Sequence, residues 1–225
     1  MNLKQLAGYI DHTLLDPRAS KEDIIKLCNE AEQHGFASVC IHPYHVRTAR
    51  MNIKGQDTKI CAVIGYPLGA NNTAIKVFEA RNAMSSGADE LEVVINIGAL
   101  KDEEETTVKA DMSAIVGAGR GKKIKVVLET GYFDDEDILL GCELAKYANV
   151  DFVSTSSGFG PTGASLADVR LLAKTAAGSF QVKAAGDIDD LSTTIQMLQA
   201  GATRIGTSSG IKILEELRIR ATTLR

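Results

Sequence analysis

The chain is poor in the residue types that mark several common protein classes. It has no tryptophan, 5% aromatic residues, four prolines and four cysteines among 225 residues. No apolar run approaches the roughly 18 residues that cross a bilayer. The first residues, Met-Asn-Leu-Lys-Gln, lack the apolar segment of a secretory signal. We therefore expect a cytoplasmic protein without a membrane partner.

Charge of one sign is not concentrated anywhere in the sequence. Twenty-five Lys and Arg face 29 Asp and Glu, which gives a formal net charge of −4 without a long basic or acidic block. Proteins that hold nucleic acid through its phosphates usually need a basic patch. The composition therefore predicts no nucleic-acid partner.

The cysteines and histidines show no clear metal-ligand spacing. Cys28, Cys40, Cys61 and Cys142 lie in apolar segments, and none belongs to a CxxC pair. This pattern is typical of buried, reduced thiols in an intracellular protein. The pair His42-x-x-His45 alone is a weak signal. The sequence predicts no metal site.

Eight short apolar runs alternate with amphipathic, helix-like segments. They are rich in Val and Ile and lie near residues 8–13, 37–42, 59–65, 90–96, 123–130, 150–155, 180–185 and 203–207. Several are apolar on both faces, as buried parallel strands are. Eight such units in a chain of this length predict an α/β fold with a single (β/α)8 TIM barrel over residues 1–225. A doubly wound open sheet is the alternative, but it usually has fewer strands and a glycine-rich first turn.

Polar residues that interrupt the apolar runs are the candidates for chemistry, because barrel enzymes act at the carboxyl ends of their strands. The five are Asp11, Glu92, Lys125, Ser154 and Lys183. A buried lysine without a partner is costly, so we expect carboxylates and ammonium groups to pair. We expect all five to line one cavity. A purely structural layer of ion pairs is the alternative.

Strand alternation extends this prediction to neighbouring residues. Alternation puts Glu92 and Asn96 on one strand face, and Lys125 and Glu129 on one face of another strand. If those faces point inward, carboxylates and ammonium groups converge on one cavity.

Two glycine-bearing turns near the end of the chain predict an anion site. Gly186 ends the seventh run, and Gly206-Thr-Ser-Ser-Gly210 joins the eighth run to the last helix. Barrel enzymes often bind phosphate at these two turns, where backbone amides begin a helix. The expected phosphate-binding residues are Gly158, Gly186, Asp187, Gly206, Ser208 and Ser209. Capping of the helix by Ser208 or Ser209 is the alternative.

Several motifs, in this order, resemble those of class I deoxyribose-phosphate aldolases. They are Ile10-Asp-His-Thr-Leu-Leu15, Val39-Cys-Ile-His-Pro43, Val63-Ile-Gly-Tyr-Pro-Leu-Gly69, Gly87-Ala-Asp-Glu90, Val94-Ile-Asn-Ile-Gly98, Lys125-Val-Val-Leu-Glu-Thr-Gly131 and Arg204-Ile-Gly-Thr-Ser-Ser-Gly210. The resemblance covers nearly the whole chain and implies a (β/α)8 barrel. It also implies reversible cleavage of 2-deoxyribose 5-phosphate into glyceraldehyde 3-phosphate and acetaldehyde, without a metal or other cofactor. We expect a sugar phosphate or aldehyde as ligand, and a homodimer or homotetramer.

The same resemblance assigns roles to the site residues. In the family, a lysine amine condenses with the substrate carbonyl, and the resulting iminium draws electrons from the breaking carbon–carbon bond. A second lysine lowers the pKa of that amine, and a carboxylate helps to relay protons. Ser154, in Asp151-Phe-Val-Ser154, stands at the Schiff-base lysine position. Lys183 matches the second lysine, and Glu92 matches the carboxylate, normally Asp.

Three departures from the family pattern therefore fall at the predicted site. Ser154 has no amine, and Glu92 reaches one methylene further than Asp. Asp187 adds negative charge where a second glycine is usual. We expect an aldolase-family enzyme with impaired or altered activity. The alternatives are a non-catalytic homologue that binds sugar phosphates, and a lyase or isomerase that uses Lys183, Lys125 or Glu92.

Overall fold

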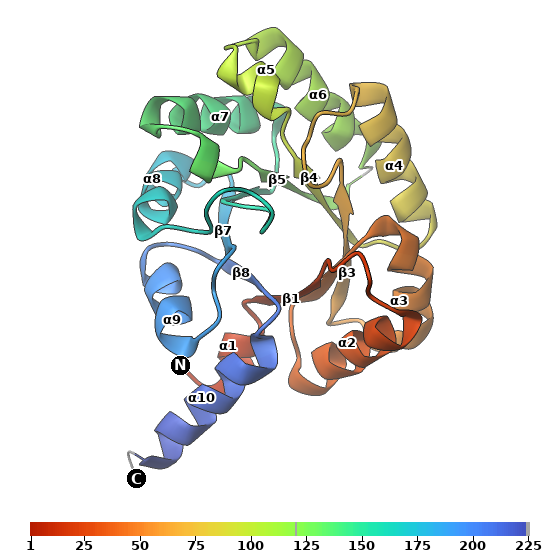
Figure 1. The fold of residues 1–225 in the computed structure, drawn as a ribbon, viewed down its shortest axis with the longest axis vertical. Helices are drawn as coiled ribbons and strands as arrows, with labels where there is room; N and C mark the ends of the chain where they lie inside the picture. The colour runs from red at the N-terminus through yellow and green to blue at the C-terminus, as the bar shows by residue number, and fades with distance from the viewer. Residues whose placement is uncertain (120, 224–225) are drawn as a thin grey trace.

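The computed structural model describes residues 1–119 and 121–223 and contains a closed barrel of eight parallel strands (Figure 1). The strands are β1 Ile10–Leu14, β2 Ser38–Ile41, β3 Lys59–Ile64, β4 Glu90–Val94, β5 Lys123–Val127, β6 Phe152–Ser154, β7 Gln181–Ala185 and β8 Arg204–Thr207. Each strand pairs with the next, and β8 pairs with β1. The predicted TIM barrel is confirmed, and the open-sheet alternative is wrong.

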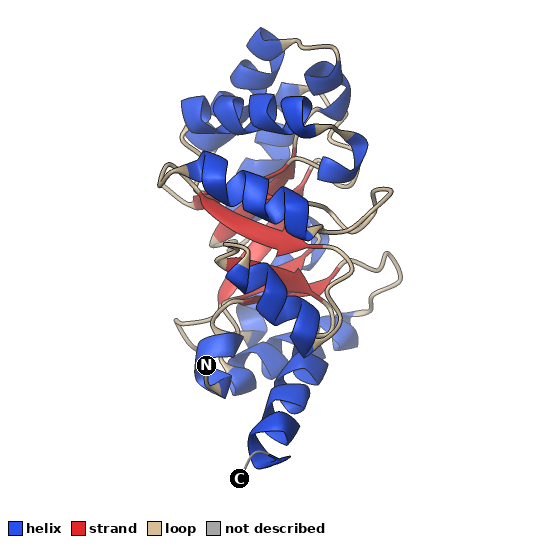
Figure 2. Ribbon diagram, turned by 90° about the vertical axis from the view of Figure 1, so that its left-hand side faces the viewer, coloured by secondary structure: helices blue, strands red, loops and turns tan. Residues whose placement is uncertain are grey.

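Helices form an outer ring around the barrel, and Figure 2 shows them above and below the strands. They are α1 Leu3–Ala7, α2 Lys21–His34, α3 Val46–Asn52, α4 Thr73–Ser85, α5 Ile97–Lys101, α6 Glu105–Ala118, α7 Asp135–Ala148, α8 Leu166–Ala176, α9 Leu191–Gln199 and α10 Gly210–Thr223, with short 3-10 turns at Pro43–His45 and Thr130–Tyr132. Helix α1 packs against α10, so the first and last helices of the described chain lie together on one side of the barrel. None of the described helices is long and apolar enough to cross a membrane.

Apolar side chains fill the space between the barrel and its helices in two large clusters. One includes Ile24 and Leu27 of α2, and the other includes Ile138 and Leu144 of α7. Burial of each such side chain contributes about 1.5–3 kcal/mol. The apolar cluster inside the barrel is much smaller, which leaves room there for charged groups.

Short polar sequences begin and end several of the helices. Ser20 and Asp23 form a capping box at the start of α2, which satisfies backbone amides that the first turn leaves free. Gly35 ends the same helix with φ 74°, in the left-handed conformation that glycine adopts at little cost. Asp134 and Ser165 cap α7 and α8.

Two strands end earlier than the alternation predicts. Strand β4 stops at Val94, and Asn96 instead caps α5 by accepting a hydrogen bond from Ala99 N at 3.2 Å. Strand β5 stops at Val127, and Glu129 adopts a left-handed backbone with φ 60°. The prediction that Asn96 and Glu129 continue the inward strand faces is therefore wrong.

Candidate active site

Among the described residues, six charged side chains meet inside the barrel. They are Asp11, Glu90, Glu92, Lys125, Lys183 and Arg204, and each is at most 9% exposed. Three carboxylates thus balance three cations. This balance is what allows them to be buried, since an unpaired ion in the interior is strongly destabilising.

Asp11 of β1 is at the centre of this network. Its Oδ2 accepts a hydrogen bond from Lys125 Nζ at 2.6 Å and lies 3.3 Å from Lys183 Nζ. Its Oδ1 accepts from Arg204 Nη1 and from Ser38 Oγ, each at 2.6 Å. Burial favours the neutral acid, but the three surrounding cations hold the pKa of Asp11 well below its usual range. Asp11 is therefore a carboxylate that anchors three cations.

Lys183 of β7 is held by two carboxylates. Its Nζ donates to Glu92 Oε2 and lies close to Asp11, while Tyr66 Oη donates to Glu92 Oε1 at 2.7 Å. Burial favours the neutral amine, but Glu92 and Asp11 together raise the pKa of Lys183 above its ordinary value. Lys183 is therefore an ammonium group at neutral pH, and not a free amine nucleophile.

Lys125 of β5 is constrained in the same way. Its Nζ lies 2.6 Å from Asp11 and 2.7 Å from Glu90, and it is fully buried. Burial opposes its charge, but Asp11 contributes most to a pKa raised well above the usual value. The surrounding carboxylates therefore favour the protonated form of both buried lysines of the network.

Ser154 is the last residue of β6 and lies between Val127 and Lys183 in the barrel register. Register partners in a parallel sheet point to the same face, and neighbouring strands are about 4.8 Å apart. Ser154 therefore points into the barrel beside Lys183. It is fully buried, and its hydroxyl has no hydrogen-bond partner among the described residues.

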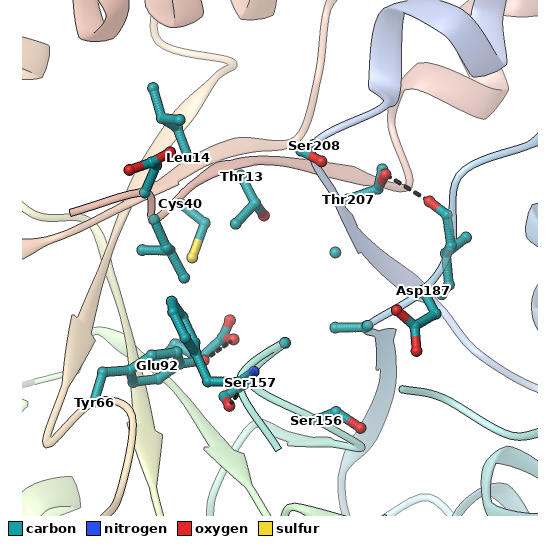
Figure 3. A pocket seen from close by; sticks show the side chains of 18 of the residues that line it. Thr13, Leu14, Cys40, Tyr66, Glu92, Ser156, Ser157, Asp187, Thr207 and Ser208 are labelled. Atoms are coloured by element: carbon teal, nitrogen blue, oxygen red, sulfur yellow. Dashed lines mark hydrogen bonds between the residues drawn. The ribbon is translucent and has the colours of Figure 1, made fainter. Parts of the chain in front are cut away.

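A cavity of about 740 Å³ opens above this network, lined by the turns that follow β1, β6, β7 and β8 (Figure 3). Glu92 and Lys183 line it, but Asp11, Lys125 and Ser154 do not. Those three are fully buried. The expectation that all five residues line one cavity is therefore wrong for three of them, although the ion pairs and the register do bring the five together.

Most of the predicted phosphate-binding residues reach the cavity wall. Gly158, Gly186, Asp187, Gly206 and Ser208 line the cavity, whereas Ser209 does not. The Ser209 amide donates to Thr207 Oγ1 at 2.8 Å, and its hydroxyl donates to Asp189 Oδ1 at 2.9 Å. Ser209 is thus engaged within the protein.

Acidic groups outnumber basic groups around the cavity. The charged lining residues are Asp16, Arg18, Glu92, Lys183, Asp187 and Asp189. Arg18 is paired with Asp16 at 2.8 Å. Asp187 Oδ2 accepts a hydrogen bond from Gly163 N at 3.0 Å, and its backbone has φ 57°. Two carboxylates, those of Asp187 and Asp189, therefore stand at the predicted anion site.

Sequence reasoning missed four members of the site, which are Ser38, Tyr66, Glu90 and Arg204. Glu90 was detectable, because it lies two residues before Glu92 and so shares its strand face. Arg204 is the first residue of β8. Its side chain is recognised as pointing inward only because Arg204 is the register partner of Lys183. Tyr66 follows the end of β3, where no periodicity applies.

The remaining histidines and cysteines have structural surroundings. His12 Nε2 pairs with Glu30 Oε2 at 2.9 Å, and its ring packs against Phe36. All four cysteines are buried and unbridged, as expected. Among the described residues, one group could supply three metal ligands: Cys40, Cys61 and Glu92.

Comparison with known families matches residues 6–216 to the profile of the DeoC/LacD family aldolases. The chain belongs to this family. It is 52% identical over 219 residues to the deoxyribose-phosphate aldolase of Thermococcus kodakarensis, covering 96% of this chain and 98% of that protein. The family resemblance seen in the sequence motifs is confirmed, and the family is one of lyases.

Two solved structures share both the fold and the sequence pattern. QR15, named as an aldolase, superposes with a TM-score of 0.93 at 41% identity, covering 98% of this chain and 99% of its own. The deoxyribose phosphate aldolase from Aeropyrum pernix, named as tetrameric, has a TM-score of 0.89 at 34% identity and covers 96% of this chain and 92% of its own. The cavity therefore lies in the scaffold of an aldolase family.

Proposed function

We propose that this chain is a deoxyribose-phosphate aldolase homologue that keeps the proton-transfer groups but lacks the amine nucleophile. The observation that carries the proposal is the surroundings of Ser154. By the family resemblance, this serine stands at the Schiff-base lysine position, and it lies beside Lys183 in the register. Both buried lysines nearby are ammonium groups, so the site has no amine ready to attack a carbonyl.

An amine at position 154 would lie among the other groups that the aldol reaction needs. The positive charge of Lys183 would lower its pKa and keep part of it neutral. That amine would add to the aldehyde carbon of the sugar, water would leave, and the iminium would accept the electron pair of the breaking carbon–carbon bond. Glu92, hydrogen-bonded by Lys183 and Tyr66, is placed to accept and return protons. A serine hydroxyl supplies no iminium, so this chain is impaired at the first step.

The substrate is proposed to be a small sugar or aldehyde bound less through phosphate than is usual in the family. Asp187 and Asp189 line the cavity at the predicted anion site, and the nearby Arg18 is already paired. A carboxylate about 4 Å from a phosphate repels it by roughly 1–4 kcal/mol, depending on exposure. That opposes the attraction of a helix N-terminus, which is about 0.3–1 kcal/mol at an exposed site.

We also propose that the chain assembles as a homodimer or homotetramer. The support is the tetrameric form named for the relative from Aeropyrum pernix, which shares 34% identity. Analytical ultracentrifugation at micromolar concentration would show a sedimenting species of two or four chains. A monomer at that concentration would contradict the proposal.

The functional proposal is tested by comparing the unchanged chain with Ser154→Lys in a retro-aldol assay with 2-deoxyribose 5-phosphate. Removing a covalent nucleophile costs on the order of 10⁴-fold or more in other enzymes. Supplying one in an unoptimised site should therefore raise the rate by roughly 10–10³-fold. A folded Ser154→Lys variant that is no faster, yet binds the sugar, would favour the non-catalytic sugar-binding homologue.

A further inference from the structure

Two thiols and a carboxylate lie close together, and two of the three groups line the cavity. Cys40 and Cys61 are register partners on β2 and β3, so their side chains point to the same side of the barrel wall. Cys61 Sγ lies 4.0 Å from Glu92 Oε2, and ligand atoms of all three residues lie within 4.8 Å of one another. Each of the three is at most 2% exposed.

The group is reached from the cavity and not from the outer surface. Cys40, Glu92 and Tyr66 line the cavity (Figure 3). Cys61 is fully buried and does not line it. A small ion that enters the cavity therefore meets Cys40 and Glu92 first. The other two cysteines, Cys28 and Cys142, lie in helices α2 and α7 within the apolar clusters outside the barrel.

The donor set suits a soft or borderline cation with tetrahedral geometry. Zinc binds thiolate sulfur at about 2.3 Å and carboxylate oxygen at about 2.0–2.2 Å, which puts tetrahedral ligand atoms roughly 3.4–3.8 Å apart. The present separations, up to 4.8 Å, need only a modest inward shift of the side chains. Three protein ligands leave a fourth position for water from the cavity or for the Tyr66 hydroxyl.

The ammonium group of Lys183 lies nearby and would repel a bound cation, but loss of the two thiol protons offsets the charge of the ion. A thiol must lose its proton to bind a metal ion. A divalent ion that replaces the two thiol protons of Cys40 and Cys61, which pass to solvent, leaves the net charge of the group unchanged. Lys183 therefore lies beside a group of the same total charge before and after binding. Its ion pair with Glu92 Oε2 is weakened, because that oxygen also binds the ion.

We propose that Cys40, Cys61 and Glu92 form a binding site for a thiophilic divalent cation, Zn²⁺ or Cd²⁺. The ion draws Glu92 away from Lys183 and occupies the cavity wall. The proposed ion takes no part in the proposed aldol chemistry, and the site does not depend on the proposed function. Harder cations such as Mg²⁺ prefer oxygen ligands and should not compete.

The test is titration of the reduced protein with CdCl₂ in the presence of a phosphine reductant and excess Mg²⁺. We expect one ion per chain and a thiolate-to-cadmium charge-transfer band in the ultraviolet. Cys40→Ser and Cys61→Ser should each weaken binding by more than the roughly 10–100-fold that loss of an outer-shell partner costs. Cys142→Ser is the matched control, because Cys142 is equally buried but remote from the cavity, and it should bind as the unchanged chain does.

A second measurement does not depend on the folding of the variants. The ¹¹³Cd nuclear magnetic resonance signal of the unchanged chain should fall in the range of mixed sulfur and oxygen ligands. A signal from oxygen ligands alone, no uptake of cadmium, or a band that survives in both Cys40→Ser and Cys61→Ser would overturn the proposal.

Discussion

Ser154 and Lys183 are direct register partners on β6 and β7, and both point into the barrel. Lys183 is bound to two carboxylates, whereas the Ser154 hydroxyl has no hydrogen-bond partner among the described residues. The pair therefore combines a fixed positive charge with a small neighbouring side chain. A new amine at position 154 would lie within the field of that charge.

Replacing Lys183 with methionine should destabilise the fold strongly. The substitution keeps the approximate length of the side chain but leaves Glu92 and Asp11 buried with one cation fewer. Breaking a buried pair in this way costs about 3–5 kcal/mol. Urea unfolding should show this loss for Lys183→Met. The exposed Lys26, which lies 3.8 Å from Glu30, is the control, and Lys26→Met should cost less than about 1 kcal/mol. Equal losses would contradict the importance of the buried network.

Borohydride reduction with acetaldehyde should not trap Lys183 or Lys125 in the unchanged chain between pH 7 and 9. Both lysines have a raised pKa, so they remain protonated and cannot form an iminium. Peptide mass spectrometry would locate any ethyl adduct. Stoichiometric modification of Lys183 at pH 7 would show instead that it acts as the substitute nucleophile.

Removing the charge of Asp187 should tighten the binding of 2-deoxyribose 5-phosphate. Asp187 stands at the open cavity wall, so the repulsion is near its lower limit of about 1 kcal/mol, which corresponds to roughly fivefold in affinity. Asp187→Asn keeps an acceptor for Gly163 N, and Asp187→Gly suits the left-handed backbone. Calorimetric titration should show a gain for both variants with the phosphorylated sugar and none with 2-deoxyribose. Unchanged affinity for the phosphate would mean that this carboxylate does not face the ligand.

The contribution of Asp11 to the free energy of unfolding should decrease as the pH falls into the acid range. Its pKa in the folded state lies well below the value of about 3.9 in the unfolded chain. Its contribution is therefore complete above about pH 4 and is lost as the pH falls through the lower folded pKa. Urea unfolding of Asp11→Asn and the unchanged chain should differ most between pH 5 and 9. The difference should shrink in strong acid, and a difference that grows below pH 4 would be inconsistent with an ionised Asp11.

The order of strands and helices could be predicted from the sequence, because it depends on local patterns. Apolar runs rich in Val and Ile located the eight strands of the barrel. The ends of strands were less visible. Asn96 and Glu129 continue the alternation in sequence, but the backbone turns before each of them.

The depth of a side chain in the barrel could not be predicted, because it depends on how far neighbouring strands are staggered. Lys125 pairs with Asp11 and Ser154 is the register partner of Lys183, but neither residue lines the cavity. The sequence also could not show which backbone amides already donate hydrogen bonds within the protein. Ser209 looked available for an anion, whereas its amide and hydroxyl are both bonded within the protein.

The most direct test of the central claim is covalent trapping in Ser154→Lys. The variant is incubated with 2-deoxyribose 5-phosphate, reduced with borohydride and mapped by peptide mass spectrometry. Ser156→Lys is the matched control, because Ser156 is another buried serine without a hydrogen-bond partner among the described residues, two positions further along. We predict an adduct on the new amine at position 154 in the first variant and none at position 156 in the second. No adduct in a folded Ser154→Lys protein, or equal trapping in both variants, would contradict the assignment of position 154 as the nucleophile's place.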